Sequence, residues 1–344
     1  MSARSGPRNQ DLRAVLGLAS TPPWERWAAG APVPGLPAAF DLARALTPAV
    51  FEAAWRRVRV PGGAGVDGHD RAWFERDLAR NLAAIRAAVL AGRWRPAPLL
   101  RRIKAKPGGG ERVLGIPTVA DRLVQAAVLE VVGPRADALL RPWVHGYRPG
   151  HSCGGAVAQL VRTVGCRPYL ELFKADVESL FDNLDHAFLA GVTDDLSPDP
   201  LWRSLNRAWR ERWAAAPGRG VPQGAPLSPL LANLYLHHAV DLPLERACAG
   251  LEGEALGLAG RLRYADDIAL VSERPGGGAR LLAWLAAALR RARLRLSPRK
   301  TVALLSAQPL SPVTVLGIPV SAVRDGARFR LSREPSLPVA TLGW

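Results

Sequence analysis

The sequence has few of the residues that disulfide-stapled, zinc-binding or membrane-spanning proteins require. Its three cysteines, Cys153, Cys166 and Cys248, stand far apart with no CxxC or Cys/His ligand spacing, which argues against a disulfide framework and a zinc site. No run of about 18 apolar residues occurs, and the first residues lack the apolar core of a signal peptide. We therefore expect a cytoplasmic protein with no membrane contact.

Lysine is scarce as well, although the chain is strongly basic. Of the 46 basic residues, 42 are arginine, and the four lysines are Lys104, Lys106, Lys174 and Lys300. The formal net charge of +16 over 344 residues indicates a polyanionic partner such as nucleic acid. A hydrophobic fraction of 48% and 11 Trp allow the chain to bury a core, which excludes a disordered basic tail.

The distribution of proline, glycine and apolar residues predicts the order of the elements. Residues 1–40 are rich in proline and predict a weakly ordered extension. Residues 98–117 alternate basic and apolar side chains around a glycine-rich tip, which predicts a basic hairpin. Apolar spacing and breakers further predict helices over 40–58, 70–91, 121–140, 201–213, 228–247 and 279–294, strands over 167–177 and 313–320, and a hairpin over 261–272.

The strongest local signal for chemistry is Tyr264-Ala265-Asp266-Asp267, at the centre of the hairpin predicted over 261–272. Adjacent carboxylates at a turn can hold a divalent cation, although a solvated acidic turn is the simpler alternative. Asp176 ends another apolar strand, where a lone Asp is usually a helix N-cap. Two metal ions need carboxylates from different elements, so the metal interpretation depends on Asp176 meeting Asp266.

A third pattern is the loop VPQGAPLSP, residues 221–229, which precedes a long apolar helix. Gly224 allows a base or sugar to approach the backbone closely. We expect Ser228 to be the N-cap and Pro229 the first helical residue. A structural cap explains these last two residues but not the whole string.

Taken in order, these strings resemble the reverse transcriptases, specifically those of the bacterial group II intron type. The resemblance covers residues 65–320. Its blocks are GVDG (65–68), IKAKPGGGERVLGIPTVADRLVQ (103–125), HGYRPGHS (145–152), KADVESLFDNLDH (174–186), PQGAPLSP (222–229), RYADD (263–267), LSPRKT (296–301) and LGI (316–318).

The resemblance implies a fold, an activity and a set of partners. The fold is an α+β right-hand polymerase, with fingers over residues 41–170 and a palm over 171–320 on a ferredoxin-like split βαβ core. The activity is RNA-directed DNA synthesis, in which dNTPs are joined to a primer 3′-OH. The implied cofactors are two Mg²⁺ ions, or Mn²⁺ in their place, and the partners are an RNA template and a DNA or RNA primer.

The resemblance also implies site residues. Asp176, Asp266 and Asp267 match the metal-binding carboxylates, with the Val177 carbonyl as a further ligand, and Lys300 matches a lysine that protonates the leaving pyrophosphate. The nucleotide would meet Lys104, Arg112, Gln223 and Gly224, with Phe181 as the bulky residue that rejects a 2′-OH. The template and primer would meet Arg148, Leu316 and Gly317. A core Phe and an exposed Arg are the ordinary alternatives for Phe181 and Arg148.

Two departures from the family pattern keep other functions open. The family's Asn before Lys300 is Ser297 here. Residues 321–344 form a tail that we expect to be too short for a full thumb, so a partner protein would supply that part, or the chain would be a truncated remnant. The alternatives are a defence- or CRISPR-associated enzyme that copies a dedicated RNA, and a non-catalytic maturase-like RNA-binding protein.

Overall fold

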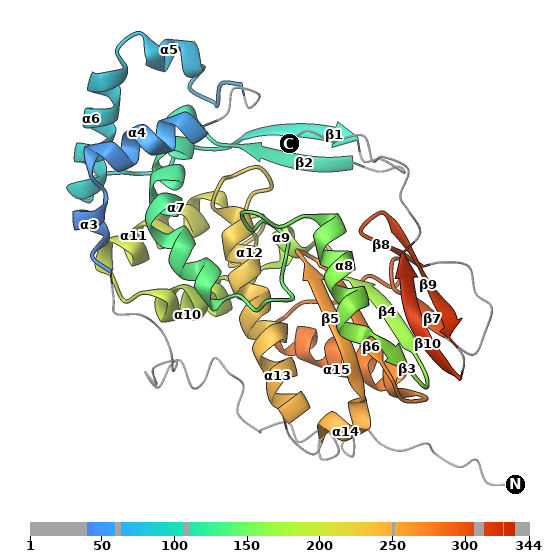
Figure 1. Ribbon diagram of the computed structural model, residues 1–344. Coiled ribbons are helices and arrows are strands. Elements are labelled where there is room, and N and C mark those ends of the chain that lie inside the picture. Colours follow the sequence, from blue (N-terminus) through green and yellow to red (C-terminus); the bar gives the residue numbers. More distant parts are fainter. Residues whose placement is uncertain are drawn as a thin grey trace, which may run out of the picture. The chain divides into compact units, whose positions relative to one another are not determined.

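The computed structural model describes residues 40–58, 63–105, 111–249, 252–305, 313–325 and 327–333 (Figure 1). The proline-rich extension up to residue 39, Lys106 with the tip of the basic hairpin, and the residues after 333 lie outside the described residues. The chain is an α+β protein, as predicted. Within the described ranges, no helix has the length and apolar character needed to cross a bilayer.

Contacts divide the chain into two units, and each is described by itself. Among the described residues, the helical unit comprises residues 40–141 and Glu178–His238, and the sheet unit comprises Pro142–Val177 and residues 239–333. This division differs from the single boundary expected after residue 170. Residues 142–170 pack with the sheet unit because α8 (Cys153–Val164) lies against strands of that unit.

The helical unit combines a helix cluster with the basic hairpin. Its elements are α3 (Leu42–Ala45), α4 (Pro48–Arg57), α5 (Arg71–Glu75), α6 (Leu78–Leu90), β1 (Leu100–Ala105), β2 (Glu111–Ile116), α7 (Val119–Leu139), α9 (Leu180–Asn183), α10 (His186–Leu196), α11 (Pro200–Trp213) and α12 (Ser228–Leu236). The long helix α7 packs against α4, α6 and α12. Six of these helices have an N-cap residue whose side chain accepts a hydrogen bond from a backbone N–H of the first turn. The N-cap residues are Asp41, Thr47, Asp70, Thr118, Asp185 and Asp199.

The start of α12 differs from the expected cap. The helix begins at Ser228 itself, so Leu227 stands at the cap position and no side chain caps the helix there. The Leu227 backbone N–H instead donates to Oε1 of Gln125 at 3.0 Å, a buried bond from another helix. The helix predicted over 228–247 is also interrupted: a π-helical turn, His237–Asp241, joins α12 to α13 (Leu242–Ala249).

The sheet unit contains two four-stranded sheets (Figure 1). The first has the order β5-β6-β4-β7, formed by β4 (Glu171–Asp176), β5 (Leu258–Tyr264), β6 (Asp267–Ser272) and β7 (Val302–Leu305). Helical segments separate β4 from β5 and β6 from β7, and all neighbouring strands are antiparallel. This order and connectivity are those of a ferredoxin-like split βαβ unit.

The second sheet has the order β3-β10-β9-β8, from β3 (Cys166–Arg167), β8 (Val313–Val315), β9 (Ile318–Asp325) and β10 (Arg328–Arg333). The single strand expected over 313–320 is wrong, because Leu316 and Gly317 have φ of 53° and 78° and turn the chain back into β9. Strands β9 and β10 also carry ordered structure beyond residue 320, where a tail was expected.

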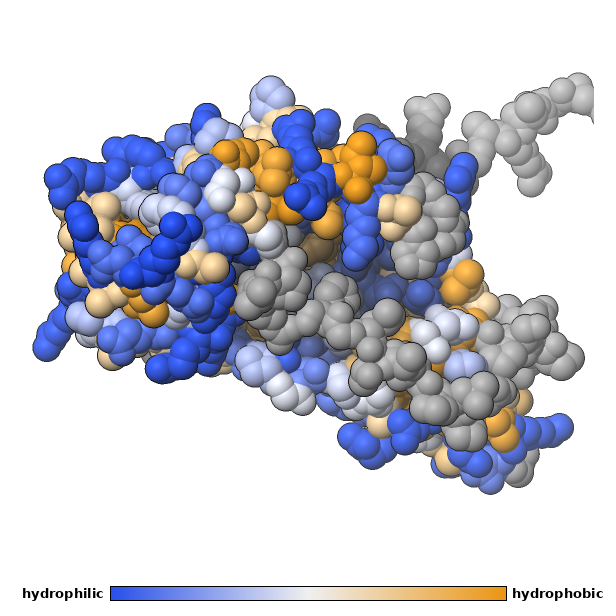
Figure 2. Space-filling model, turned by 90° about the horizontal axis from the view of Figure 1, so that it is seen from above, coloured by the Kyte–Doolittle hydropathy of each residue, from blue (hydrophilic) through white to orange (hydrophobic). Residues whose placement is uncertain are grey.

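Helices cover both faces of the first sheet. On one face, Leu172, Ala269 and Val271 form a core with α8 and with apolar residues of the second sheet. On the other face lies α15 (Gly277–Arg291), whose Leu281, Trp284 and Leu285 are buried. Within the described residues, this unit also contains α13 and α14 (Glu252–Leu256). The molecular face seen in Figure 2 is largely hydrophilic, with small apolar patches.

Candidate active site

The acidic hairpin predicted from the sequence is present. Strands β5 and β6 pair with Tyr264 opposite Asp267, so Ala265 and Asp266 form a two-residue turn. Ala265 has a φ of 55°, a left-handed conformation that is uncommon for a residue with a side chain. The turn therefore places Asp266 at the tip and Asp267 at the first position of β6.

Strand pairing brings Asp176 to the same place. Asp176 is the last residue of β4 and lies directly opposite Asp267 of β6. The Val177 N–H donates to the Asp266 carbonyl at 3.2 Å, which fixes the turn beside the end of β4. The condition set by the sequence, that Asp176 should meet the acidic hairpin, is satisfied by this register.

Two lysines contact these carboxylates. Lys300 Nζ lies 3.1 Å from Oδ1 and 3.0 Å from Oδ2 of Asp176. The backbone N–H of Ser297 donates to the Asp176 carbonyl at 2.8 Å, so the loop that carries Lys300 is pinned to β4. Lys174, two residues before Asp176 on the same strand face, forms an ion pair of 3.2 Å with Oδ1 of Asp267.

Burial and mutual repulsion perturb the acids. Burial, with repulsion from Asp176, raises the pKa of Asp266 from 3.8 to about 6. Burial also raises the pKa of Asp176, although the ion pair with Lys300 opposes that shift. The same ion pair raises the pKa of Lys300. The two lysines therefore neutralise only part of the negative charge of the three carboxylates.

The carboxylates of this cluster are suitable ligands for a divalent cation. Within the described ranges, no three His, Cys, Asp or Glu side chains converge closely enough to form a complete cation site. Mg²⁺ does not require one, because it usually keeps several waters and is held by one or two carboxylates together with substrate phosphates. Oδ1 of Asp267 is buried and accepts no hydrogen bond despite its ion pair. A cation would satisfy this oxygen and offset the raised pKa of Asp266, so the residues fit.

The residues expected to meet the nucleotide lie in the helical unit and are linked to one another. Lys104 and Arg112 are exposed and directly opposite each other on the β1–β2 hairpin. The Gly115 N–H at the base of β2 donates to the Gln223 carbonyl at 3.0 Å, which ties the Gln223-Gly224 loop to the hairpin. The Val221 N–H donates to the Phe181 carbonyl at 2.8 Å, so the same loop also holds α9.

The residues expected to meet the template and primer lie in the sheet unit. Arg148 is half-buried and its Nη1 donates to the Val144 carbonyl at 2.8 Å, so it is not the exposed arginine considered as the alternative. Leu316 packs against the core of the unit, and Gly317 completes the β8–β9 turn.

Gly146, in the block HGYRPGHS, received no role from the sequence. A Cβ on Gly146 would stand 2.4 Å from the backbone nitrogen of Ala265, so only glycine lets this loop pack on the acidic turn. The His145 N–H donates to the Arg263 carbonyl at 2.8 Å and holds the loop there. The sequence showed that GYRPG matches the family pattern, but the contact of this loop with the acidic turn could be found only from the structure.

Arg263, in the block RYADD, is a second residue that sequence reasoning missed. It is 1% exposed, and its Nε and Nη2 bond both oxygens of Asp241, at 3.0 and 2.6 Å. This ion pair anchors β5, just before the acidic turn, to the end of the π-helical turn. Lys174 was singled out in the sequence as one of four lysines, but its ion pair with Asp267 could not be predicted without the strand pairing.

Comparison with known proteins identifies the family. Residues 104–320, more than half of the chain, match the family described as reverse transcriptase (RNA-dependent DNA polymerase). The group II intron-encoded protein LtrA of Lactococcus lactis subsp. cremoris is 30% identical over 200 residues, which are 56% of this chain and 33% of LtrA. Protein YkfC of Escherichia coli (strain K12) is 29% identical over 195 residues, 54% of this chain and 51% of YkfC.

An uncharacterized 91 kDa protein in the cob intron of Schizosaccharomyces pombe is 32% identical over 139 residues, 38% of this chain and 17% of that protein. The match with LtrA thus spans a third of that protein, and the match with YkfC about half. The family match contains Asp176, Asp266 and Asp267 together with the strands that position them. The chain therefore belongs to the reverse transcriptase family.

Proposed function

We propose that the protein is an RNA-directed DNA polymerase of the group II intron type, which joins dNTPs to a primer 3′-OH along an RNA template. Membership of the reverse transcriptase family supports the reaction, and the names of LtrA and of the cob intron protein support the intron type. The observation that carries the proposal is the register that sets Asp176 opposite Asp267, beside the turn that carries Asp266. The sheet unit would serve as the palm and the helical unit as the fingers.

The carboxylates would hold two Mg²⁺ ions. Asp176 and Asp266 would be the principal ligands, with the Val177 carbonyl and Asp267 beside them. Bound Mg²⁺ stabilises charge on the transferring phosphoryl group and lowers the pKa of the attacking hydroxyl. Until a cation binds, Lys300 and Lys174 neutralise part of the charge on Asp176 and Asp267.

Lys300 would also protonate the leaving pyrophosphate. Its ammonium group is a titratable donor, which a guanidinium is not at physiological pH. The Lys300 side chain is 62% exposed, whereas that of its partner Asp176 is only 8% exposed. The lysine can therefore turn from the carboxylate toward a substrate, while the carboxylate stays fixed by its strand.

The helical unit would bind the incoming nucleotide. The opposed side chains of Lys104 and Arg112 suit a triphosphate, because both can donate charge-assisted hydrogen bonds to phosphate oxygens. Gln223 and Gly224 would pack against the nascent base pair, and Phe181 would exclude a 2′-OH. Arg148, Leu316 and Gly317 would contact the template and primer.

Primer extension on an RNA template, with and without Mg²⁺, tests the proposal. Asp176→Asn and Asp266→Ala should abolish extension while the fold is retained, because each removes a principal metal ligand. Asp325→Asn is the matched control, since Asp325 is an exposed acid of the same unit whose pairing with Arg330 is long, at 3.8 Å. Extension by either site variant above a few per cent of the parent rate would reject the metal assignment.

The role of Phe181 has its own test. Phe181→Ala should admit ribonucleotides, because the bulk that would clash with the 2′-OH is gone. Phe181→Tyr keeps that bulk and should keep the selectivity of the parent. The measurement is the competition between dNTP and rNTP in extension products, and unchanged selectivity in the alanine variant would reject the steric role.

A further inference from the structure

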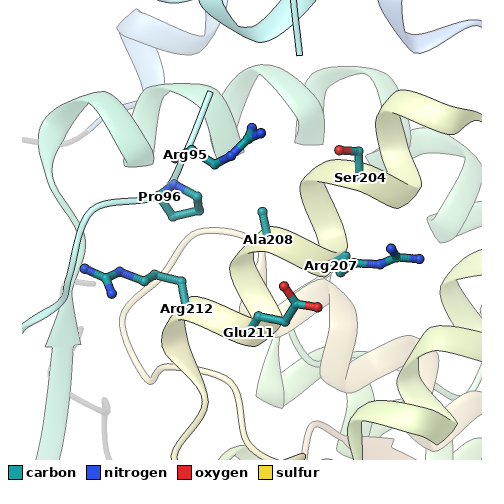
Figure 3. Close-up of a pocket in the computed structure, with 7 residues that line it drawn as sticks. All are labelled: Arg95, Pro96, Ser204, Arg207, Ala208, Glu211 and Arg212. Carbon is teal, nitrogen blue, oxygen red and sulfur yellow. The ribbon is translucent and has the colours of Figure 1, made fainter. Parts of the chain in front are cut away.

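A basic groove lies on the helical unit, between α11 and the segment that precedes β1 (Figure 3). It has a volume of about 630 Å³. Its charged lining residues are Arg95, Arg207, Glu211 and Arg212, and Ser204 adds a hydroxyl group. None of these residues is among those assigned to the metal ions, the nucleotide or the template.

Partly buried hydrogen bonds hold both walls of the groove. Nε1 of Trp213, at the end of α11, donates to the Ala97 carbonyl at 2.7 Å. The Ala97 N–H donates to Oδ2 of Asp121 at 3.1 Å, so both backbone polar groups of this residue have partners in the helical core. The groove is therefore built before any ligand arrives, which lowers the entropy cost of binding.

The buried face of α11 explains why its arginines point outward. Trp202, Leu205, Trp209 and Trp213 recur at helical spacing and are each at most 3% exposed. Arg207 and Arg212 are exposed and extend from the helix in opposite directions (Figure 3). A rigid apolar stripe thus presents two guanidinium groups along the groove.

The arginines of the groove differ from Arg203 on the same helix, which has an acidic partner. Arg203 pairs with Asp194 at 3.1 Å. In the part of the chain that the structure describes, Arg207 and Arg212 form neither an ion pair nor a hydrogen bond. Among the described residues, Arg95 donates to the backbone carbonyls of Gly92 at 2.9 Å and Trp94 at 2.7 Å and pairs with no acid.

We propose that this groove binds the phosphodiester backbone of a folded RNA, at a site additional to the template and primer contacts. Arginine suits that ligand because its planar fork matches the geometry of a phosphate group. The lining contains three arginines and one glutamate, so its net charge is positive. An apolar or cationic ligand would remove water from these charged groups without forming interactions that offset the cost. The inference does not depend on polymerase activity.

Binding of a circularised RNA stem-loop tests the proposal, because such an RNA has no 3′ end to act as a primer. The affinity is measured by fluorescence anisotropy in EDTA without nucleotides, over a series of salt concentrations. Each lost phosphate contact should reduce the log–log salt slope by about 0.9 and, from counterion release alone, weaken binding about fivefold near 0.15 M salt. Arg207→Gln with Arg212→Gln should therefore weaken binding about 30-fold.

A double variant of equal charge change is the control. Arg76 and Arg80 are exposed arginines of the same unit outside the groove, and Arg80 is only 3.7 Å from Asp77. Arg76→Gln with Arg80→Gln should change the affinity much less than the groove variant, while thermal melting shows that both are folded. Equal losses in the two double variants, or no loss in the groove variant, would overturn the proposal.

Two further arms sharpen the test. Glu211→Gln removes the acid of the groove and should tighten RNA binding about threefold, from the Coulomb energy of two charges about 6 Å apart in water. Misfolding cannot mimic such a gain, and unchanged or weaker binding would count against the groove. An effect confined to a DNA stem-loop of the same sequence would assign the groove to DNA and refute an RNA site.

Discussion

The buried ion pair between Arg263 and Asp241 supplies the sharpest test of how the acidic hairpin is held. Both side chains are 2% exposed, so replacing Asp241 with Asn would leave a guanidinium charge in a place that water does not reach. Breaking a buried pair from one side costs about 3 to 5 kcal/mol, because the remaining charge keeps its desolvation penalty. With a urea m-value of about 2.5 kcal/mol/M, the unfolding midpoint of the sheet unit should fall by about 1 to 2 M.

Hydrogen exchange of peptides that cover β5 and β6 measures this loss where it occurs, and it separates the sheet unit from the helical unit. Asp325→Asn is the control, because it makes the same chemical change in an exposed pair of the same unit, worth about 0 to 1 kcal/mol. Primer extension should fall together with protection, since β5 leads directly into the turn that carries Asp266. A loss of protection below about 1 kcal/mol, or one equal to that of the control, would refute the anchoring role.

Two further predictions concern stability. Burial raises the pKa of Asp121 from 3.8 to about 6, so the folded protein keeps a proton that the unfolded chain releases in this window, and stability should fall by about 3 kcal/mol as the pH rises through it. Asp121→Asn should remove that dependence in urea titrations between about pH 4 and pH 7, and an unchanged slope would contradict the assignment. Gly146→Ala should cost about 1 to 3 kcal/mol and slow primer extension, because its Cβ would meet Ala265. Gly154→Ala, with open space around its Cβ, should leave both thermal stability and extension near parent values, and equal effects of the two variants would dismiss the steric argument.

Local patterns predicted most of the elements around the site. The apolar arms of the hairpin and the strand that ends at Asp176 are visible because buried strands need continuous apolar residues. The helix α11 follows from the spacing of its tryptophans. Local patterns could not predict that Asp176 and Asp267 lie close together. The pairing between β4 and β6 joins residues about ninety positions apart, and its register is set by the packing of the whole sheet.

What the sequence could not predict depends on long-range packing. The partner of Arg263 is Asp241, which no local pattern distinguishes from other acids, and burial alone makes their bond important. Serine is a common N-cap residue, but Ser228 is not the N-cap here. Gln125 of another helix accepts the backbone N–H of Leu227, and the helix starts at Ser228, one residue earlier than a Ser228 cap would require. Leu316 adopts a positive φ that its residue type disfavours, so the β8–β9 turn was hidden inside an apparent strand.

The scarcity of lysine gains a physical meaning at the candidate active site. Lys174 and Lys300 are the two lysines of the sheet unit, and each contacts a carboxylate expected to bind metal. A lysine neutralises a carboxylate as a compact point charge, whereas an arginine would engage both oxygens in a planar fork and compete harder with an entering cation. Lys174→Arg should therefore raise the Mg²⁺ concentration needed for half-maximal extension, and Lys300→Arg should slow nucleotide addition without weakening RNA binding. The exposed exchange Arg330→Lys in the same unit is the control, and variants with the parent's Mg²⁺ dependence and addition rate would show that the surviving lysines have no such role.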